Sequence, residues 1–235
     1  MNTSTHPSPP TVSPLAQADA AWIALGVQHA VLARAMPVVR HDIAGLLTIM
    51  RMGAVVLRRR AGDEQALGPQ LEQFEEHLVH LSDSVRRLRH WDLGPGTSEP
   101  LDETAQLARE LAYPLLAMRG LDLTLGSEGA PLPTTRAPQQ AVLSLLLGAI
   151  HALAEAPDGP PAVVRVLAVP GSEGRLRVQA EGHAPDAPPA APTPGIPPLD
   201  GAALGHLARH LGAGLHQGAG WFEIEPPPVP PKPQG

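Results

Sequence analysis

A heptad pattern of apolar residues that runs without a break from Leu15 to Leu57 limits what this chain can fold into more than any other feature. Apolar or small residues recur at alternating spacings of three and four, and His29 is the one polar member of the series. The spacing predicts one long helix, and further apolar residues beside the pattern widen its stripe to the width of a four-helix bundle. Pro37 lies inside this helix and predicts a kink, because its ring lacks an N–H and crowds the carbonyl of Ala33.

A second, shorter heptad pattern extends from Leu71 to Leu88. The sequence AGDEQALGPQ at 61–70 separates the two patterns and predicts a turn. Two amphipathic helices joined in this way form an antiparallel hairpin, which has more apolar surface than its own two helices cover. We therefore expect residues 15–92 to form a dimerisation unit in which two copies of the chain pair as a homodimer into a four-helix bundle. The pattern leaves open whether residues 15–36 extend this bundle or form a docking arm.

Beyond residue 92 the sequence changes to short segments that are typical of a mixed α/β domain. DLGPGTSEP at 92–100 predicts a linker, and the domain itself is expected over 100–225. Helices are expected at 102–119, 138–156 and 200–212, and strands at 121–125, 162–169, 174–180 and 220–225. The Pro-rich segment 183–198 suits neither element, and we expect the polar and Pro-rich ends, 1–14 and 226–235, to be disordered.

The composition argues against several classes of function. A net charge of −6 argues against a nucleic-acid binder, and the absence of cysteine excludes disulfides and a cysteine nucleophile. No apolar run reaches the roughly 20 residues that span a bilayer, and the N-terminus lacks the regions of a secretory signal, so we expect a cytoplasmic protein without a membrane partner. His206 and His210 have the spacing of a zinc-chelating pair, but no third ligand stands out. We expect neither a metal nor a cofactor.

His41 is the strongest candidate for chemistry in the chain. The heptad pattern assigns it to position f, the most exposed position of the first helix. A neutral imidazole on a rigid helix is a good phosphoryl acceptor, and a protein domain can dock on its exposed face. The neighbouring Asp42 can orient the imidazole, and Arg40 can steady the charge of a phosphoryl group. The alternative interpretation is that His41 is a surface histidine without a function.

The sequence RHDIAGLLTIM, which begins at Arg40, resembles the H-box of sensor histidine kinases. The positions that fit the usual pattern of that box are His41, Asp42, Ile43, Leu47 and Thr48. The positions that depart from it are Ala44 for a basic residue, Gly45 for Thr or Asn, and Leu46 for Pro. In the family the Thr or Asn side chain is implied in orienting water for phosphatase action. The resemblance therefore implies a phosphorylated histidine but not a phosphatase activity toward a partner.

The second half of the chain resembles the ATP-binding domain of the same family in its layout. AVLSLLLGAIHALAEAP at 141–157 is similar to the N-box helix, with Gly148 in place of the Asn that holds magnesium and phosphates and His151 in place of a second polar residue. The Asp that accepts the adenine amino group falls on Ala180 in one alignment and on Ala191 in another. The resemblance thus implies an α+β chain, a helical hairpin followed by a degenerate histidine-kinase-type ATPase α/β sandwich domain that does not bind ATP.

Three functions are consistent with this sequence. The first is a histidine phosphotransferase of a two-component phosphorelay, a pseudokinase that passes a phosphoryl group between receiver-domain aspartates through His41, with Asp42 and Arg40 assisting. Its partners, by resemblance, are receiver domains of response regulators and a hybrid histidine kinase. The second is a non-enzymatic scaffold that binds or sequesters a response regulator or a kinase, with His41 incidental. The third is a divergent kinase that still uses ATP.

Overall fold

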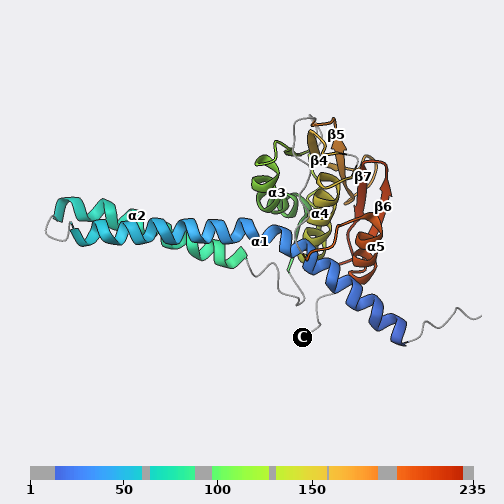
Figure 1. Ribbon diagram of the computed structural model, residues 1–235, viewed down its shortest axis with the longest axis horizontal. Helices are drawn as coiled ribbons and strands as arrows, with labels where there is room; N and C mark the ends of the chain where they lie inside the picture. The colour runs from blue at the N-terminus through green and yellow to red at the C-terminus, as the bar shows by residue number, and fades with distance from the viewer. Residues whose placement is uncertain are drawn as a thin grey trace, which may run out of the picture.

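The chain folds into a long helical hairpin that projects from an α/β domain (Figure 1). The computed structural model describes residues 14–59, 64–87, 97–126, 131–157, 159–184 and 195–229. Helix α1 spans Pro14–Arg59 and helix α2 spans Glu64–Arg87. The α2 helix packs along the C-terminal half of α1, where Gly53 lets the helices approach closely: a Cβ atom on Gly53 would lie 3.4 Å from Cδ2 of Phe74. The predicted helical hairpin is thus confirmed.

Helix α1 is divided between two surroundings. Its N-terminal half packs against the α/β domain, where Ala30, Val31, Ala35 and Val39 are buried in the same core as the domain's own residues. Its C-terminal half leaves the domain and pairs with α2 (Figure 1). The helix changes direction between the two halves (Figure 1), and it contains Pro37. Burial therefore divides the segment 15–36, whose role the sequence left open. Ala30, Val31 and Ala35 belong to the core of the α/β domain, whereas Trp22 and Ile23 are 72% and 47% exposed.

The α/β domain contains the remaining elements of the described chain. The helices are α3 (Leu101–Ala117), α4 (Gln139–Ala154) and α5 (Gly201–His210). The strands are β1 (Ser98–Pro100), β2 (Asp122–Leu125), β3 (Arg136–Pro138), β4 (Val163–Ala168), β5 (Leu176–Glu181), β6 (Gly214–Gly218) and β7 (Trp221–Glu225). Five strands form one sheet in the order β2-β4-β5-β7-β6, in which β2 and β4 are parallel and every other pair is antiparallel. Strands β1 and β3 form a separate antiparallel pair.

One face of the large sheet packs against the helices. The inward side chains alternate along each strand and include Val164 and Val166 of β4 and Val178 of β5. Helix α4 is the most completely buried element, and its apolar sequence fills the space between the sheet, α3, α5 and α1. Its burial on all sides explains why its sequence shows no polar face.

The opposite face of the sheet carries ion pairs between neighbouring strands. Arg177 of β5 pairs with Glu223 of β7 and lies over the ring of Trp221, with its guanidinium carbon 4.9 Å from the ring centroid. Arg165 of β4 pairs with Glu181 of β5 at 2.7 Å. These cross-strand contacts account for the polar residues that interrupt the apolar ones in the strands.

The structure corrects the sequence prediction at several elements. Helix α2 begins at Glu64, so the turn predicted at 61–70 is wrong from Glu64 onward, while 61–63 lies outside the described residues. Good helix formers precede Gly68 and Pro69, and the helix continues through both. Strands β1, β3 and β6 were not predicted because they are short and lack an alternating apolar pattern. The α+β fold class is confirmed.

One helix of the described chain, Gln17–Arg59, has the length and apolar composition of a membrane span. The core helix of a soluble protein passes the same test. The buried side chains of Ala30, Val31 and Ala35 pack inside the α/β domain rather than facing outward. This part of α1 is therefore a helix of the domain core, whereas the C-terminal half lies outside it.

Candidate functional site

His41 lies on α1 just beyond the part of the helix that packs in the α/β domain. Its side chain is 88% exposed, and its Nδ1 atom lies 3.6 Å from Oδ1 of Asp42. This distance is too long for a hydrogen bond but short enough for charge attraction. Arg40 is exposed on the same turn, and it makes no hydrogen bond or ion pair within the part of the chain that the structure describes. All three predicted site residues are thus exposed, with Asp42 on the Nδ1 side of the ring.

The helix surface next to His41 is formed by small side chains. Ala44 and Gly45 follow His41 by three and four positions and therefore lie on the same face of the helix. A Cβ atom on Gly45 would have no other atom within 4 Å. The hydroxyl of Thr48 donates to the carbonyl of Ala44 at 2.8 Å. The imidazole consequently stands above a low, open surface to which another protein has access.

The α4 positions that the sequence singled out are covered by other helices. A Cβ atom on Gly148 would lie 2.5 Å from Cδ2 of Leu204 in α5 and 3.4 Å from Cγ2 of Val31 in α1. Both neighbouring side chains are fully buried. Gly148 is therefore needed for close packing of three helices, and the space beside it holds apolar side chains.

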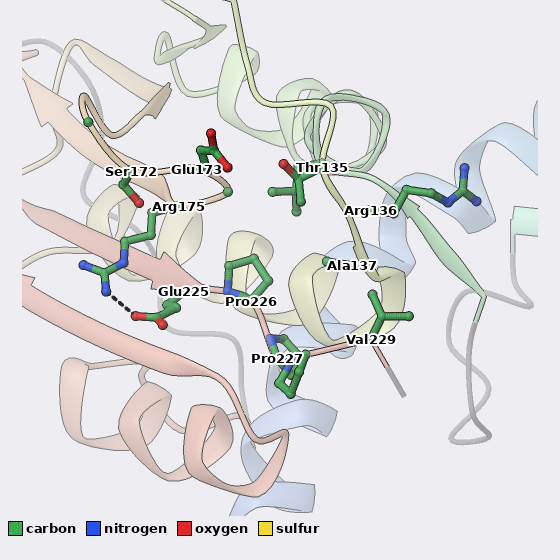
Figure 2. A pocket seen from close by; sticks show the side chains of 14 residues that line it. Thr135, Arg136, Ala137, Ser172, Glu173, Arg175, Glu225, Pro226, Pro227 and Val229 are labelled. Atoms are coloured by element: carbon green, nitrogen blue, oxygen red, sulfur yellow. Dashed lines mark hydrogen bonds and ion pairs between the residues drawn. The ribbon is translucent and has the colours of Figure 1, made fainter. Parts of the chain in front are cut away.

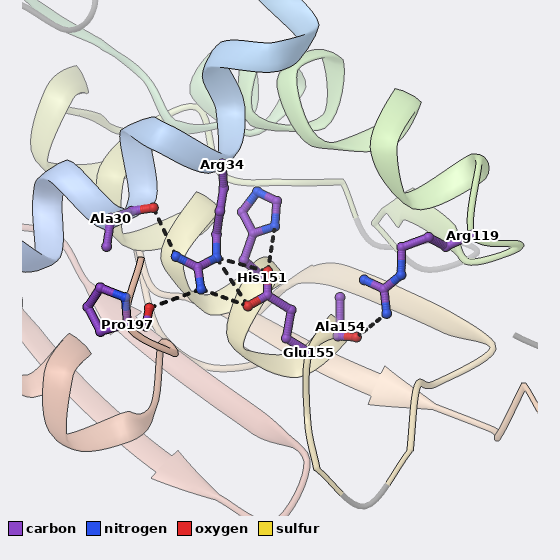
Figure 3. A network of polar contacts seen from close by, with 7 residues as sticks. All are labelled: Ala30, Arg34, Arg119, His151, Ala154, Glu155 and Pro197. Atoms are coloured by element: carbon purple, nitrogen blue, oxygen red, sulfur yellow. Dashed lines mark hydrogen bonds and ion pairs between the residues drawn. The ribbon is translucent and has the colours of Figure 1, made fainter. Parts of the chain in front are cut away.

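A buried polar network lies at the C-terminal end of α4, about two turns beyond Gly148 (Figure 3). Arg34 of α1 donates from Nε to Oε1 of Glu155 and from Nη2 to Oε2, both at 2.8 Å. Its remaining donors reach the carbonyls of Ala30 at 3.0 Å and Pro197 at 3.1 Å. The guanidinium therefore joins α1, the end of α4 and the segment before α5. Sequence analysis did not predict this network, although Arg34 is a charged residue inside an apolar stretch.

His151 belongs to the same network and is buried. Its Nδ1 lies 3.8 Å from Oε1 of Glu155, and its Nε2 has no hydrogen-bond partner among the described residues. Burial lowers the pKa of His151 to about 4, because loss of water and the nearby Arg34 and Arg119 outweigh the attraction of Glu155. The imidazole is therefore neutral at pH 7.

Of the two positions at which the sequence could place an adenine-binding carboxylate, the structure describes one, Ala180, and not the other, Ala191. Ala180 lies on β5, and its backbone N–H donates to the carbonyl of Gly220 at 2.8 Å. Ala191 lies outside the described residues, as does most of the Pro-rich segment 183–198. Where the structure describes that segment it contains no helix or strand, and Pro197 accepts the hydrogen bond from Arg34.

A charged cleft of about 550 Å³ lies elsewhere on the α/β domain (Figure 2). It is formed by the turn between β4 and β5, the segment before β3, and the chain that follows β7. Arg175 and Glu225 pair across one side of it at 2.5 Å. None of its lining residues belongs to α1, so the cleft does not include His41.

The histidines of the C-terminal region do not form a metal site in the described chain. No group of three His, Cys, Asp or Glu residues there has the geometry to hold a metal ion. Arg209 donates from Nη2 to Nδ1 of His206 at 3.1 Å. His206 and His210 both lie on the short helix α5, which accounts for their spacing in the sequence.

Comparisons with known proteins give likeness at the level of the fold. No family model matches the chain, and no curated protein matches it. Among solved structures, the histidine kinase AdeS of Acinetobacter baumannii is similar over 80% of this chain and 97% of its own, with 14% identity and a TM-score of 0.40. The cytoplasmic segment of the histidine kinase QseC is similar over 64% of this chain and 92% of its own, with 16% identity and a TM-score of 0.38.

A bacterial phosphotransferase is also similar, over 92% of this chain and 99% of its own, with 17% identity and a TM-score of 0.34. All three TM-scores are 0.40 or lower. Identities and TM-scores in this range concern the arrangement of helices and strands, and they assign no activity to this chain.

Proposed function

We propose that the chain is a histidine phosphotransferase of a two-component phosphorelay, in which His41 carries a phosphoryl group between the aspartates of receiver domains. The observation that carries the proposal is the position of His41: an imidazole that is 88% exposed, beside the small side chains Ala44 and Gly45, on a helix whose two halves pack against the α/β domain and against α2. A nucleophile that must reach a phosphoryl group held by another protein requires such access.

The proposed reaction is an in-line transfer. Nε2 of neutral His41, the ring nitrogen away from Asp42, attacks the phosphorus of an aspartyl phosphate on a receiver domain. The N–P bond forms as the P–O bond to the aspartate breaks, and the receiver carboxylate leaves with the electron pair. Positive charge that develops on the imidazole is balanced by Asp42, whose Oδ1 is 3.6 Å from Nδ1. Arg40 attracts the phosphoryl oxygens, the receiver supplies magnesium, and the reverse reaction delivers the group to a second receiver.

The phosphoryl group in this proposal comes from a partner rather than from ATP. The family resemblance would put the metal-holding residue at Gly148, where Leu204 and Val31 occupy the neighbouring space. A side chain able to coordinate magnesium would have to displace the buried side chain of Leu204 from that position. A phosphorylated receiver domain, or a hybrid histidine kinase that carries one, is therefore the donor that we propose.

We further propose that two chains pair through the hairpin as a homodimer in the cytoplasm. Several large apolar side chains of the hairpin are about half exposed or more in the single chain. They are Leu47, Ile49, Met52, Val55, Leu71, Leu78, Val79 and Val85. Exposed apolar side chains repeated along two packed helices are typical of a surface that a second copy covers.

The test is transfer of radiolabelled phosphate from phosphorylated receiver domains of the same organism to the purified chain. Acid-labile label on the wild type and none on His41→Ala is the expected result. His80→Ala is a matched control, because His80 is another exposed histidine of the hairpin and should leave labelling unchanged. Equal labelling of the wild type and His41→Ala would contradict the proposal.

A second function, a scaffold that binds a receiver or kinase without transferring phosphate, is favoured by one observation. The surface beside His41 consists of Ala44 and Gly45, which provide no side-chain donor to the imidazole. In that case the labelling experiment gives no label with any receiver, while receiver binding is measurable and survives His41→Ala.

A further inference from the structure

The N-terminal half of α1 makes two kinds of contact with the α/β domain, one apolar and one polar. We propose that these contacts of residues 24–39 permanently hold the α/β domain in one orientation relative to the hairpin. Arg34 is the positioning residue that makes the polar contact. The proposal concerns the motion of the domain, and it does not depend on whether His41 carries a phosphoryl group.

The first contact is apolar. Val31 is fully buried and packs beside Gly148 of α4, where fully buried Leu204 of α5 meets it. Ala30, Ala35 and other small residues of α1 belong to the same core, so the helix lies close to the domain along several turns. Moving α1 away would expose this whole surface to water, because the apolar sides of α4 and α5 would lose their cover.

The second contact is polar and is made by one side chain. Arg34 is almost fully buried, and its hydrogen bonds go to Glu155 at the end of α4, to the carbonyl of Pro197 before α5 and to Ala30 of its own helix (Figure 3). Guanidinium and carboxylate form a two-bond pair whose geometry lysine cannot reproduce. Since both groups are mostly out of water, neither can leave the other without a compensating partner.

The geometry of α1 extends the effect of this contact to His41. The helix continues from Arg34 through Pro37 to His41, which follows Arg34 by seven positions, or about two turns and roughly 10 Å along the axis. Because every residue from Arg34 to His41 is helical, including Pro37, we expect a domain held by Arg34 to keep one position relative to the His41 side chain. The structure thus contains no free linker on the α1 side about which the domain could rotate, in the part of the chain that is described.

The chain offers a direct test because it contains no cysteine. Arg51→Cys in the hairpin and Met118→Cys in the domain, both at exposed positions, provide unique sites for a pair of spin labels. Labelled chain is mixed with an excess of unlabelled chain, so that each assembly carries one labelled pair. Pulsed electron resonance should give one narrow distance distribution in otherwise wild-type protein. Arg34→Met and Glu155→Gln should each broaden it at least twofold.

Controls distinguish loss of the Arg34 contact from a general loss of structure. Arg175→Met removes an exposed ion pair with Glu225 far from α1 and should leave the distribution unchanged. The double variant Arg34→Met with Glu155→Gln should be no broader than Arg34→Met alone, because both changes break one contact. If Arg34→Met does not fold by circular dichroism, Arg34→Lys and Glu155→Gln carry the test. A broad or two-peaked distribution in the wild type, or variants as narrow as Arg175→Met, overturns the proposal.

Discussion

The guanidinium of Arg34 and the carboxylate of Glu155 form a two-bond ion pair across 121 positions of the chain. Nε and Nη2 of Arg34 each donate at 2.8 Å, and the two side chains are 5% and 22% exposed. The pair connects the first helix of the chain to the end of α4, and neutral His151 lies beside it. Because one partner is on the helix that carries His41, this contact relates the α/β domain to the candidate site.

Breaking this pair from one side should destabilise the protein. Arg34→Met leaves the Glu155 charge mostly buried without its partner, and we expect a loss of about 3 kcal/mol in the free energy of unfolding. Arg175→Met removes a much more exposed ion pair and should cost less than about 1 kcal/mol. Urea unfolding followed by circular dichroism measures both. Equal losses in the free energy of unfolding for the two variants would show that burial of the Arg34–Glu155 pair does not increase its contribution to stability.

His151 should make stability depend on pH. Its pKa is about 4 in the folded chain against 6.5 for an unperturbed histidine, so between these values the unfolded chain binds more protons. Stability from this residue is therefore fully present above pH 6.5 and falls as the pH drops toward 4, by up to about 3 kcal/mol. Urea unfolding at pH 7.5 and pH 5 should show a smaller difference for His151→Gln, which does not titrate, than for the wild type. The same pH difference in both proteins would contradict the assignment.

Adding a side chain at Gly148 should disturb the packing of three helices. Gly148→Asn places atoms where Leu204 and Val31 lie, and we expect a loss of about 1–3 kcal/mol in the free energy of unfolding. Leu204→Ala in the same chain should recover part of that loss. Gly45→Ala is the matched control, because its Cβ meets no atom within 4 Å and an alanine in an exposed helix should stabilise by about 0.5–1 kcal/mol. Thermal unfolding of the four proteins distinguishes the outcomes.

If His41 transfers phosphate, Asp42 should affect the rate of phosphoryl transfer but not which residue is phosphorylated. Asp42→Asn removes the negative charge 3.6 Å from Nδ1 while the side chain keeps its size. We expect the rate of transfer from a phosphorylated receiver to fall about tenfold, an amount that corresponds to about 1.4 kcal/mol in the barrier. Quenched-flow labelling measures the rate, and label should still appear on His41. An unchanged rate of transfer would contradict the role that we propose for Asp42.

The apolar face of the hairpin should determine the oligomeric state. Met52 is 66% exposed on α1, and Met52→Glu places a charge on the surface that we propose a second copy covers. We expect the dimer to dissociate at micromolar concentration, as measured by analytical ultracentrifugation. Met118 is 81% exposed on the α/β domain, outside the hairpin, so Met118→Glu should leave the sedimentation coefficient unchanged. A monomeric wild type would contradict the pairing.

Much of the fold could be predicted from the sequence because periodic patterns report local structure directly. The heptad pattern from Leu15 to Leu57 predicted α1, and the apolar run that contains Gly148 predicted α4. The exposure of His41 followed from its place in the same pattern. The predicted site residues Arg40 and Asp42 are its neighbours in the chain, but successive helix positions point about 100° apart, so the helix places these two residues on either side of His41.

Only the tertiary structure decided which surface each half of α1 covers. A heptad pattern states that a face is buried but not what buries it, so Val31 and Leu47 look alike in sequence although one is in the domain core and the other is exposed on the hairpin. The pairing of Arg34 with Glu155 depends on contacts between distant segments, which no local spacing encodes. The sequence by itself therefore determined the helices and the exposed histidine, and long-range packing decided how the domain is held beside it.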